Sequence, residues 1–300
     1  MDDEPPSLLV IVLDASLPLW RTREITRLHQ DGNPSLKQPR VATFQETLEA
    51  LLVFLESYLL MHRGNDVAFI AASRTGSRVL YPPPEFRAQG RSLPNGAVSS
   101  GDLQNCLVNG LRTLAADDGA AERGERPGTR LLPGPAMAKA MSQSLCYINR
   151  LKLEAAAVQA RLLVLQGEAD VAEHYNSIMN CIFSAQKAQV PVDCCVLAAG
   201  HSMFLQQAAY LSGGFYHSSS EPGLLPALLA TFLPSASCRR YLSLRRQESI
   251  DFRAACFCHR RVVEVAYVCS VCLSVFCAFS PICSTCGTRA KPPQVVRRGR

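Results

Sequence analysis

The chain has 300 residues, is 48% hydrophobic and carries a formal net charge of +6. This length suits one large domain with a sizeable core and a small second domain. No apolar run reaches the ~18 residues of a membrane helix, and the acidic start MDDEPPS lacks the basic region of a signal peptide, so we predict neither membrane contact nor a secretory leader. Thirteen cysteines without a secretory signal indicate a reducing compartment, with thiols that are buried or bound to metal.

The positive charge is concentrated at the C-terminal end. From Cys238 onward there are twelve Lys or Arg and three Asp or Glu, a balance of +9 against +6 for the whole chain, so the remainder is slightly acidic. A solvated tail ending in RRGR explains this pattern. The alternatives are a nuclear targeting signal or a weak electrostatic contact with nucleic acid.

Apolar, branched runs alternate with amphipathic stretches through most of the chain. The first run, LLVIVL, is continuously apolar, as in a parallel strand buried on both faces. Thr43 and Glu46 form a T-x-x-E capping box, and Gly213 closes a short helix. The predicted strands are 8–13, 66–72, 77–81, 161–165, 190–197 and 215–217. The predicted helices are 41–62, 103–114, 137–151, 175–183, 204–211 and 223–232. We expect Asp170 and Glu173 to cap the fourth helix.

This alternation predicts an α/β fold with a doubly wound, mostly parallel sheet, whose strand C-termini carry the loops that hold ligands. Asp14 stands at one of these strand ends. Composition predicts a sheet domain over residues 1–235, a linker over 236–251, a four-cysteine zinc finger over 252–288 and a basic tail over 289–300. Within the first domain, residues 82–134 are rich in Pro, Gly and charge and are predicted to form a long, mobile insertion.

Seven of the thirteen cysteines lie between Cys256 and Cys286. Among them, Cys269 and Cys272 form one C-x-x-C, and Cys283 and Cys286 form a second, ten residues further on. Two such pairs present four thiolates to one tetrahedral Zn²⁺. We therefore predict a zinc site with these four ligands. Because four thiolates leave no open coordination position, we expect the zinc to be structural and not catalytic.

Further candidate ligands lie near this site in the sequence: Cys256, Cys258, His259 and Cys277. Together with the first four they make eight, the number that a RING-like module needs for two metals. Cys256 and Cys258 form an unusual C-x-C pair, and Cys277 has no cysteine partner close to it. A second zinc site made by these residues is therefore an alternative to a single zinc.

Motifs for nucleophilic catalysis or nucleotide binding do not occur in the sequence, since it has no G-x-S-x-G, no P-loop and no G-x-G-x-x-G. His201 and His217 are single histidines without an obvious acid and nucleophile beside them. We therefore predict that the protein is not an enzyme.

The segments LVIVLDAS, DVAFIAAS and LQQAAYLSGGFYH resemble those of von Willebrand factor A domains. The resemblance implies the fold of that family, in which a D-x-S-x-S loop often holds Mg²⁺. Here the loop runs from Asp14 and Ser16 to Pro18, which has no hydroxyl, and the fourth strand leads into QGE where T-D-G would be expected. Because Mg²⁺ needs a near-octahedral set of hard oxygens, we do not expect Mg²⁺ here. We expect Asp14 and Ser16 to satisfy loop amides instead.

Combined with such a domain, the motifs ACFCHR, YVCSVCLSVFC and SPICSTC resemble a narrower family, the smaller von Willebrand A-type subunit (Tfb4/p34) of TFIIH, the general transcription and DNA repair factor. The resemblance covers nearly the whole chain except residues 82–134 and the tail. It implies a nuclear, non-catalytic core subunit that acts in RNA polymerase II transcription initiation and nucleotide excision repair. Its partners would be other TFIIH core subunits, chiefly the larger von Willebrand A-like, zinc-containing subunit.

Two other functions are compatible with the sequence. The eight candidate metal ligands are compatible with a RING-type ubiquitin ligase, and two bound zinc ions per chain would favour that function. The basic tail is compatible with a zinc protein that binds DNA directly. Against this function, the apolar stretch VVEVAYVCSVCLSVF lacks the interleaved aromatic and basic residues of nucleic-acid-binding surfaces. An apolar zinc module more often packs against protein, so we expect DNA contact to be indirect or weak, through the basic tail.

Overall fold

The computed structural model describes residues 6–32, 42–83, 100–123, 136–154, 158–171, 174–197, 200–218, 223–235, 238–242, 256, 258–259, 263–272 and 274–290. Six strands within them form one sheet in the order β3-β2-β1-β4-β5-β6. They are β1 (Ser7–Asp14), β2 (Asn65–Ser73), β3 (Gly76–Tyr81), β4 (Gln159–Gln166), β5 (Val192–Val196) and β6 (Tyr216–Ser218). The edge strand β3 is antiparallel to β2, and the other neighbours are parallel. The predicted doubly wound, mostly parallel sheet is confirmed.

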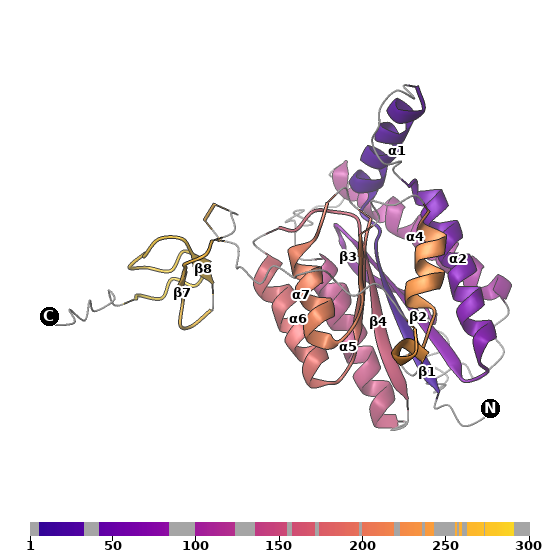
Figure 1. Cartoon of the computed structure of the whole chain (residues 1–300). Helices are drawn as coiled ribbons and strands as arrows, with labels where there is room; N and C mark the ends of the chain where they lie inside the picture. The colour runs from indigo at the N-terminus through magenta and orange to yellow at the C-terminus, as the bar shows by residue number, and fades with distance from the viewer. Residues whose placement is uncertain are drawn as a thin grey trace, which may run out of the picture.

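Helices cover both faces of this sheet (Figure 1). One face is covered by α5 (Ala136–Glu154), α6 (Tyr175–Lys187) and α7 (Met203–Ser212). The other face is covered by α2 (Phe44–Met61), α4 (Ser100–Glu122) and the short α8 (Leu224–Ala227), which continues into the π-helical turn η2 (Leu228–Phe232). The first half of α1 (Leu17–Gly32) also packs on this second face, and the rest of α1 extends away from the sheet (Figure 1).

The central strand β1 explains why its sequence is continuously apolar. Leu8, Val10 and Val12 pack into the core on the α5–α7 face, and Leu9, Ile11 and Leu13 pack into the core on the α2–α4 face. Successive side chains of a strand point to opposite faces, and here both faces are covered. Each of these six side chains is at most 1% exposed.

The helix α1 was not predicted, although Ser16 before it and Pro18 in its first turn are helix-start signals. Its apolar stripe is weak, because Arg23 and Arg27 are buried while Ile25 and Leu28 are 57% and 72% exposed. The burial of Arg23 depends on distant partners: its guanidinium donates to the carbonyl oxygen of Leu197 at 2.7 Å and to that of Ala42 at 3.2 Å. A sequence pattern does not contain these contacts.

The helix α4 lies inside the segment predicted to be a mobile insertion. It is longer than the predicted helix at 103–114, and four of its leucines are buried in the core on the α2 face, namely Leu103, Leu107, Leu111 and Leu114. This part of the segment therefore belongs to the folded domain. Residues 84–99 and 124–135 lie outside the described part, so the predicted mobility of the rest remains a prediction.

Local capping signals have mixed outcomes. The Thr43–Glu46 capping box at α2 is present, and Gly213 ends α7 in the left-handed conformation with φ of 77°. The predicted capping of α6 by Asp170 is wrong. The Asp170 carboxylate instead accepts the Ser202 hydroxyl at 2.6 Å and the Phe204 amide at 3.1 Å, at the start of α7. Glu173 lies outside the described residues.

The C-terminal region forms a small separate unit (Figure 1). After the 3₁₀ turn η3 (Cys238–Arg240), it contains a two-stranded antiparallel sheet of β7 (Tyr267–Val268) and β8 (Val275–Phe276), and a bridge between Ile282 and Arg289. Asn176 on α6 contacts Ser274 of this unit, with 3.5 Å between the amide nitrogen and the hydroxyl. Most of the predicted linker, residues 243–251, lies outside the described part.

Candidate functional site

Asp14 is buried at the carboxyl end of β1, where the sequence predicted a degenerate metal loop. Its Oδ1 accepts the amide of Ser16 at 3.3 Å, and its Oδ2 accepts the amides of Gly167 and Glu168 at 3.2 Å and 3.1 Å. The expectation that Asp14 satisfies loop amides is confirmed. The Ser16 hydroxyl does not do so, because it donates to the Glu168 carboxylate at 3.1 Å.

The electrostatics of this strand end follow from burial. The pKa of Asp14 is raised from 3.8 to about 6, because burial and, to a smaller extent, the negative charge of Glu168 raise it by more than the three amide donors lower it. Gln166, the last residue of β4, donates from its side chain to the Asp170 carboxylate at 3.0 Å. The acidic side chains at this end are therefore bonded to amides, a hydroxyl and an amide side chain of the protein itself.

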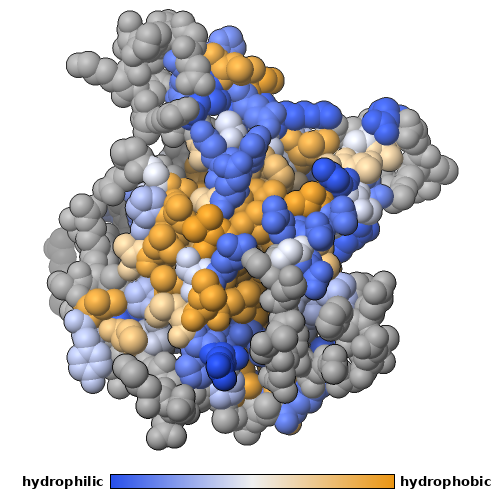
Figure 2. All heavy atoms as spheres, turned by 90° about the vertical axis from the view of Figure 1, so that its right-hand side faces the viewer, coloured by the Kyte–Doolittle hydropathy of each residue, from blue (hydrophilic) through white to orange (hydrophobic). Residues whose placement is uncertain are grey.

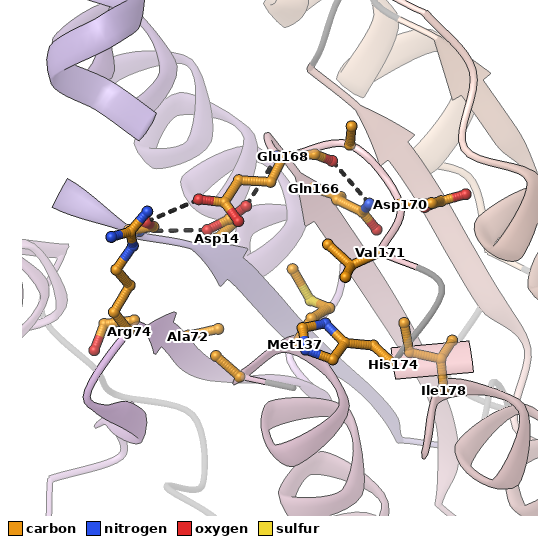
Figure 3. A pocket seen from close by; sticks show the side chains of 14 residues that line it. Asp14, Ala72, Arg74, Met137, Gln166, Glu168, Asp170, Val171, His174 and Ile178 are labelled. Atoms are coloured by element: carbon orange, nitrogen blue, oxygen red, sulfur yellow. Dashed lines mark hydrogen bonds between the residues drawn. The ribbon is translucent and has the colours of Figure 1, made fainter. Parts of the chain in front are cut away.

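A cavity of about 150 Å³ opens beside these groups. Figure 3 shows that Asp14, Glu168 and Asp170 border it from the ends of β1 and β4, while Met137 and Ile178 supply apolar side chains. Since a water molecule occupies about 30 Å³ of liquid, the cavity has room for a few waters or one small group. The bonds of Asp14 link the loop that follows β1 to the loop that follows β4.

A second, apolar pocket of about 290 Å³ lies between α1, α2 and α4. Trp20 is one of the residues that line it. The indole nitrogen of Trp20 donates to the carbonyl oxygen of Asp14 at 2.9 Å, and its ring packs edge-on against that of Phe44 with 5.0 Å between the ring centroids. Leu48 and Val108 add apolar walls, and charged side chains stand around them. The charged lining residues are Arg21, Glu24 and Arg112. Sequence analysis missed this pocket because it missed α1; the single Trp of the chain was the available signal.

The four predicted zinc ligands come together in the C-terminal unit. The ligand atoms of Cys269, Cys272, Cys283 and Cys286 all lie within 4.8 Å of one another. The sulfur atoms of Cys269 and Cys286 are 3.7 Å apart, and those of Cys272 and Cys283 are 3.5 Å apart. Four sulfurs at the corners of a tetrahedron with Zn–S bonds of ~2.3 Å are separated by roughly 3.8 Å. The cluster therefore fits a Zn²⁺ ion.

The remaining candidate ligands form a second cluster in the same unit. The ligand atoms of Cys256, Cys258, His259 and Cys277 also lie within 4.8 Å of one another. Cys277, which lacks a near partner in the sequence, has its sulfur 3.2 Å from His259 Nδ1 and 3.5 Å from the Cys258 sulfur. The structure thus brings together all eight residues that the sequence singled out, in two groups of four.

The same unit exposes apolar side chains near the metal ligands. Val265, Val268 and Val271 are 83%, 59% and 65% exposed, whereas Val275 and Phe276 of β8 are buried. A second apolar area lies on the sheet domain: Figure 2 views the side that carries α2 and the α8–η2 helix and shows apolar side chains gathered across its middle, bordered by polar ones. Contiguous exposed apolar areas are a feature of surfaces that contact a protein, a membrane or a ligand.

Neither of the two histidines considered as catalytic candidates lines the cavity beside Asp14. His201 is exposed, with its Nδ1 3.5 Å from the hydroxyl of Tyr216, and His217 lies on the short edge strand β6. Among the described residues, no helix is both long enough and apolar enough to cross a bilayer.

Comparison with known proteins decides the family. The model of the family described as transcription factor Tfb4 matches residues 6–287. The chain belongs to the Tfb4 family. It is 33% identical to the general transcription factor IIH subunit 3 of Dictyostelium discoideum, covering 96% of this chain and 90% of that protein. It is also 33% identical to the general transcription and DNA repair factor IIH subunit TFB4 of Arabidopsis thaliana, covering 94% of this chain and 88% of that protein.

A solved structure supports the fold of this Tfb4 family member. The crystal structure of the TFIIH p34 N-terminal domain superposes with a TM-score of 0.59 at 24% sequence identity, and the match covers 76% of this chain and 99% of that one. The sheet domain thus has the fold of that p34 N-terminal domain, and the two clusters of candidate metal ligands lie in a smaller C-terminal unit.

Proposed function

We propose that this protein is a non-catalytic structural subunit of the TFIIH core and acts in RNA polymerase II transcription initiation and nucleotide excision repair. The observation that carries the proposal is the family match over residues 6–287, since relatives at about one-third identity are named as TFIIH subunits in transcription and DNA repair. The protein then works in the nucleus. The basic tail, residues 289–300, provides at most an indirect or weak contact with DNA.

Zinc in this proposal has a structural role. Cys269, Cys272, Cys283 and Cys286 hold one Zn²⁺ through four thiolates, so no position stays open for a substrate. The unit around them has little apolar core of its own, and metal binding therefore supplies much of its folding free energy. Mg²⁺ has no part in the proposal, because the Asp14 carboxylate is already bonded to three amides.

The principal partner is the larger von Willebrand A-like, zinc-containing TFIIH subunit, as the resemblance implied. We place its contact at the apolar pocket between α1, α2 and α4. The pocket is large enough for one aromatic or long aliphatic side chain, its walls are apolar, and Arg21, Glu24 and Arg112 provide charged groups around such an anchor. Buried aromatic anchors surrounded by polar groups carry most of the binding free energy in protein interfaces.

The contact is tested by a charge placed in the pocket wall. Val108 lines the pocket, and the next residue of α4, Asn109, is exposed and does not line it. We expect Val108→Glu to reduce co-purification with the other TFIIH core subunits at least tenfold, because the new carboxylate would have to lose its hydration when an apolar side chain of the partner fills the pocket. Asn109→Glu adds the same charge and should assemble like the wild type. A folded Val108→Glu variant that co-purifies normally would contradict the proposed contact.

A further inference from the structure

The second cysteine and histidine cluster has the chemistry of a metal site. The sulfur of Cys256 is 3.8 Å from His259 Nδ1, the Cys258 sulfur is 3.5 Å from the Cys277 sulfur, and His259 Nδ1 is 3.2 Å from that same sulfur. The first two separations are close to those of the first cluster and to the edge of a zinc tetrahedron, and the third is a few tenths of an ångström shorter. The sulfurs of Cys256 and Cys258 are closer, at 2.7 Å, which is still well beyond a disulfide bond of about 2.05 Å.

We propose that Cys256, Cys258, His259 and Cys277 bind a second Zn²⁺, so that the C-terminal unit is a two-metal module. Three thiolates and one imidazole suit zinc, whereas Mg²⁺ and Ca²⁺ prefer oxygen ligands. The site has four protein ligands and is closed, so this ion is structural as well. The inference concerns the architecture of the module and does not depend on the partner proposed above.

The order of the ligands along the chain interlocks the two sites. The second site takes Cys256, Cys258 and His259, the first site then takes Cys269 and Cys272, the second takes Cys277, and the first ends with Cys283 and Cys286. Each metal therefore closes a loop that contains ligands of the other. The two sites cannot form as two successive independent fingers, and the module folds as one unit.

The interlocking determines what the second ion holds in place. Cys277 directly follows β8, whose Val275 and Phe276 are buried, and Cys272 of the first site precedes β8. One metal thus fixes each end of the strand. Cys256 is completely buried and lies five residues after Asp251, the last residue of the predicted linker. The second zinc therefore also fixes the point at which the chain enters the module.

Counting metals in the full-length chain tests this inference. Native mass spectrometry of the protein, purified with zinc and a thiol reductant, is expected to find two zinc ions per chain. His259→Ala should bind fewer than two, whereas His259→Cys replaces the nitrogen ligand with sulfur and should keep both. With Co²⁺ in place of zinc, His259→Cys should also shift the visible absorption, since one site changes from three sulfurs and one nitrogen to four sulfurs.

The control and the contrary outcomes separate this inference from the proposed function. Cys238→Ser removes an exposed cysteine outside both clusters and should leave two ions. One zinc per wild-type chain, or two zinc ions in His259→Ala, would overturn the second site but leave the first site and the TFIIH role intact. A wild-type chain without zinc would overturn both metal sites. Two ions no longer favour a ubiquitin ligase, because the chain belongs to the Tfb4 family.

Discussion

Asp66 is the second residue of β2, beside Leu8 of β1, and it is largely buried. Burial raises the pKa of its carboxyl group from 3.8 to about 6. Between pH ~4 and ~6 the folded protein keeps a proton that the unfolded chain has already released. The contribution of Asp66 to the free energy of unfolding therefore falls as the pH rises through this window. Above pH ~6 the buried charge lowers the free energy of unfolding by a constant amount.

We predict that Asp66→Asn stabilises the protein at pH 7.5 by about 1 kcal/mol, after allowance for solvent screening. The amide has no charge to bury, so the gain should disappear toward pH 4, where the wild-type carboxyl is protonated. Urea unfolding at several pH values measures the difference in the free energy of unfolding between Asp66→Asn and the wild type. Asp102→Asn, at an exposed position of α4, is the matched control. A gain from Asp66→Asn that is the same at every pH would show that ionisation is not its cause.

At the scale of elements, a buried ion network joins β4, β5 and η3. Asp193 on β5 is fully buried and receives both terminal nitrogens of Arg239, at 2.8 Å and 2.6 Å. Arg161 on β4 lies 3.8 Å from the same carboxylate and donates to the carbonyl oxygens of Phe232 and Pro234 at 2.6 Å and 3.0 Å. The network therefore fixes the end of η2 and the start of the linker to the sheet.

Removing the shared carboxylate is expected to be costly. Asp193→Ala leaves two buried guanidinium groups without their counter-ion, and the expected loss of stability is about 3–5 kcal/mol. Urea denaturation measures it as a lower midpoint. The control is Asp117→Ala, which breaks the ion pair with Arg78, whose side chain is 43% exposed, and should cost at most about 1 kcal/mol. Equal losses in the two variants would contradict the role given to the buried network.

At the scale of the whole molecule, two potential contact surfaces lie on one chain. The pocket between α1, α2 and α4 belongs to the sheet domain, and the exposed valines belong to the metal module. Two contacts joined by one chain raise each other's effective concentration, so an assembly is stable even when each contact is weak. The proposed TFIIH subunit would therefore need both parts for full assembly.

Deleting residues 252–300 is predicted to weaken incorporation into TFIIH at least tenfold while the sheet domain stays folded. The domain should survive because Arg239, which closes the buried network with Asp193, is retained. Circular dichroism checks the fold, and co-purification with the other subunits measures incorporation. A truncated chain that assembles as well as the full chain would rule out a second contact. Ligase or nuclease activity of the purified full chain would contradict the non-catalytic role.

Local signals in the sequence were sufficient to predict those features of the structure that depend only on neighbouring residues. The apolar run of β1, the Thr43–Glu46 capping box and the left-handed Gly213 each depend on a few adjacent positions, and each is present as predicted. The C-x-x-C spacing likewise identified the four ligands that meet in the first cluster. The resemblance of these segments and motifs was enough to predict the family.

Tertiary structure decided the features that join distant parts of the chain. The polar helix α1 is held by the bonds of Arg23 to backbone far away, and the pocket beside Trp20 exists because α1, α2 and α4 converge. Asp170 precedes α6 but caps α7, because the end of β4 lies beside the start of α7. Cys277 lacks a sequence neighbour and finds its partners across the β7–β8 turn. Spacing along a chain cannot reveal such partners, because folding alone brings them within bonding distance.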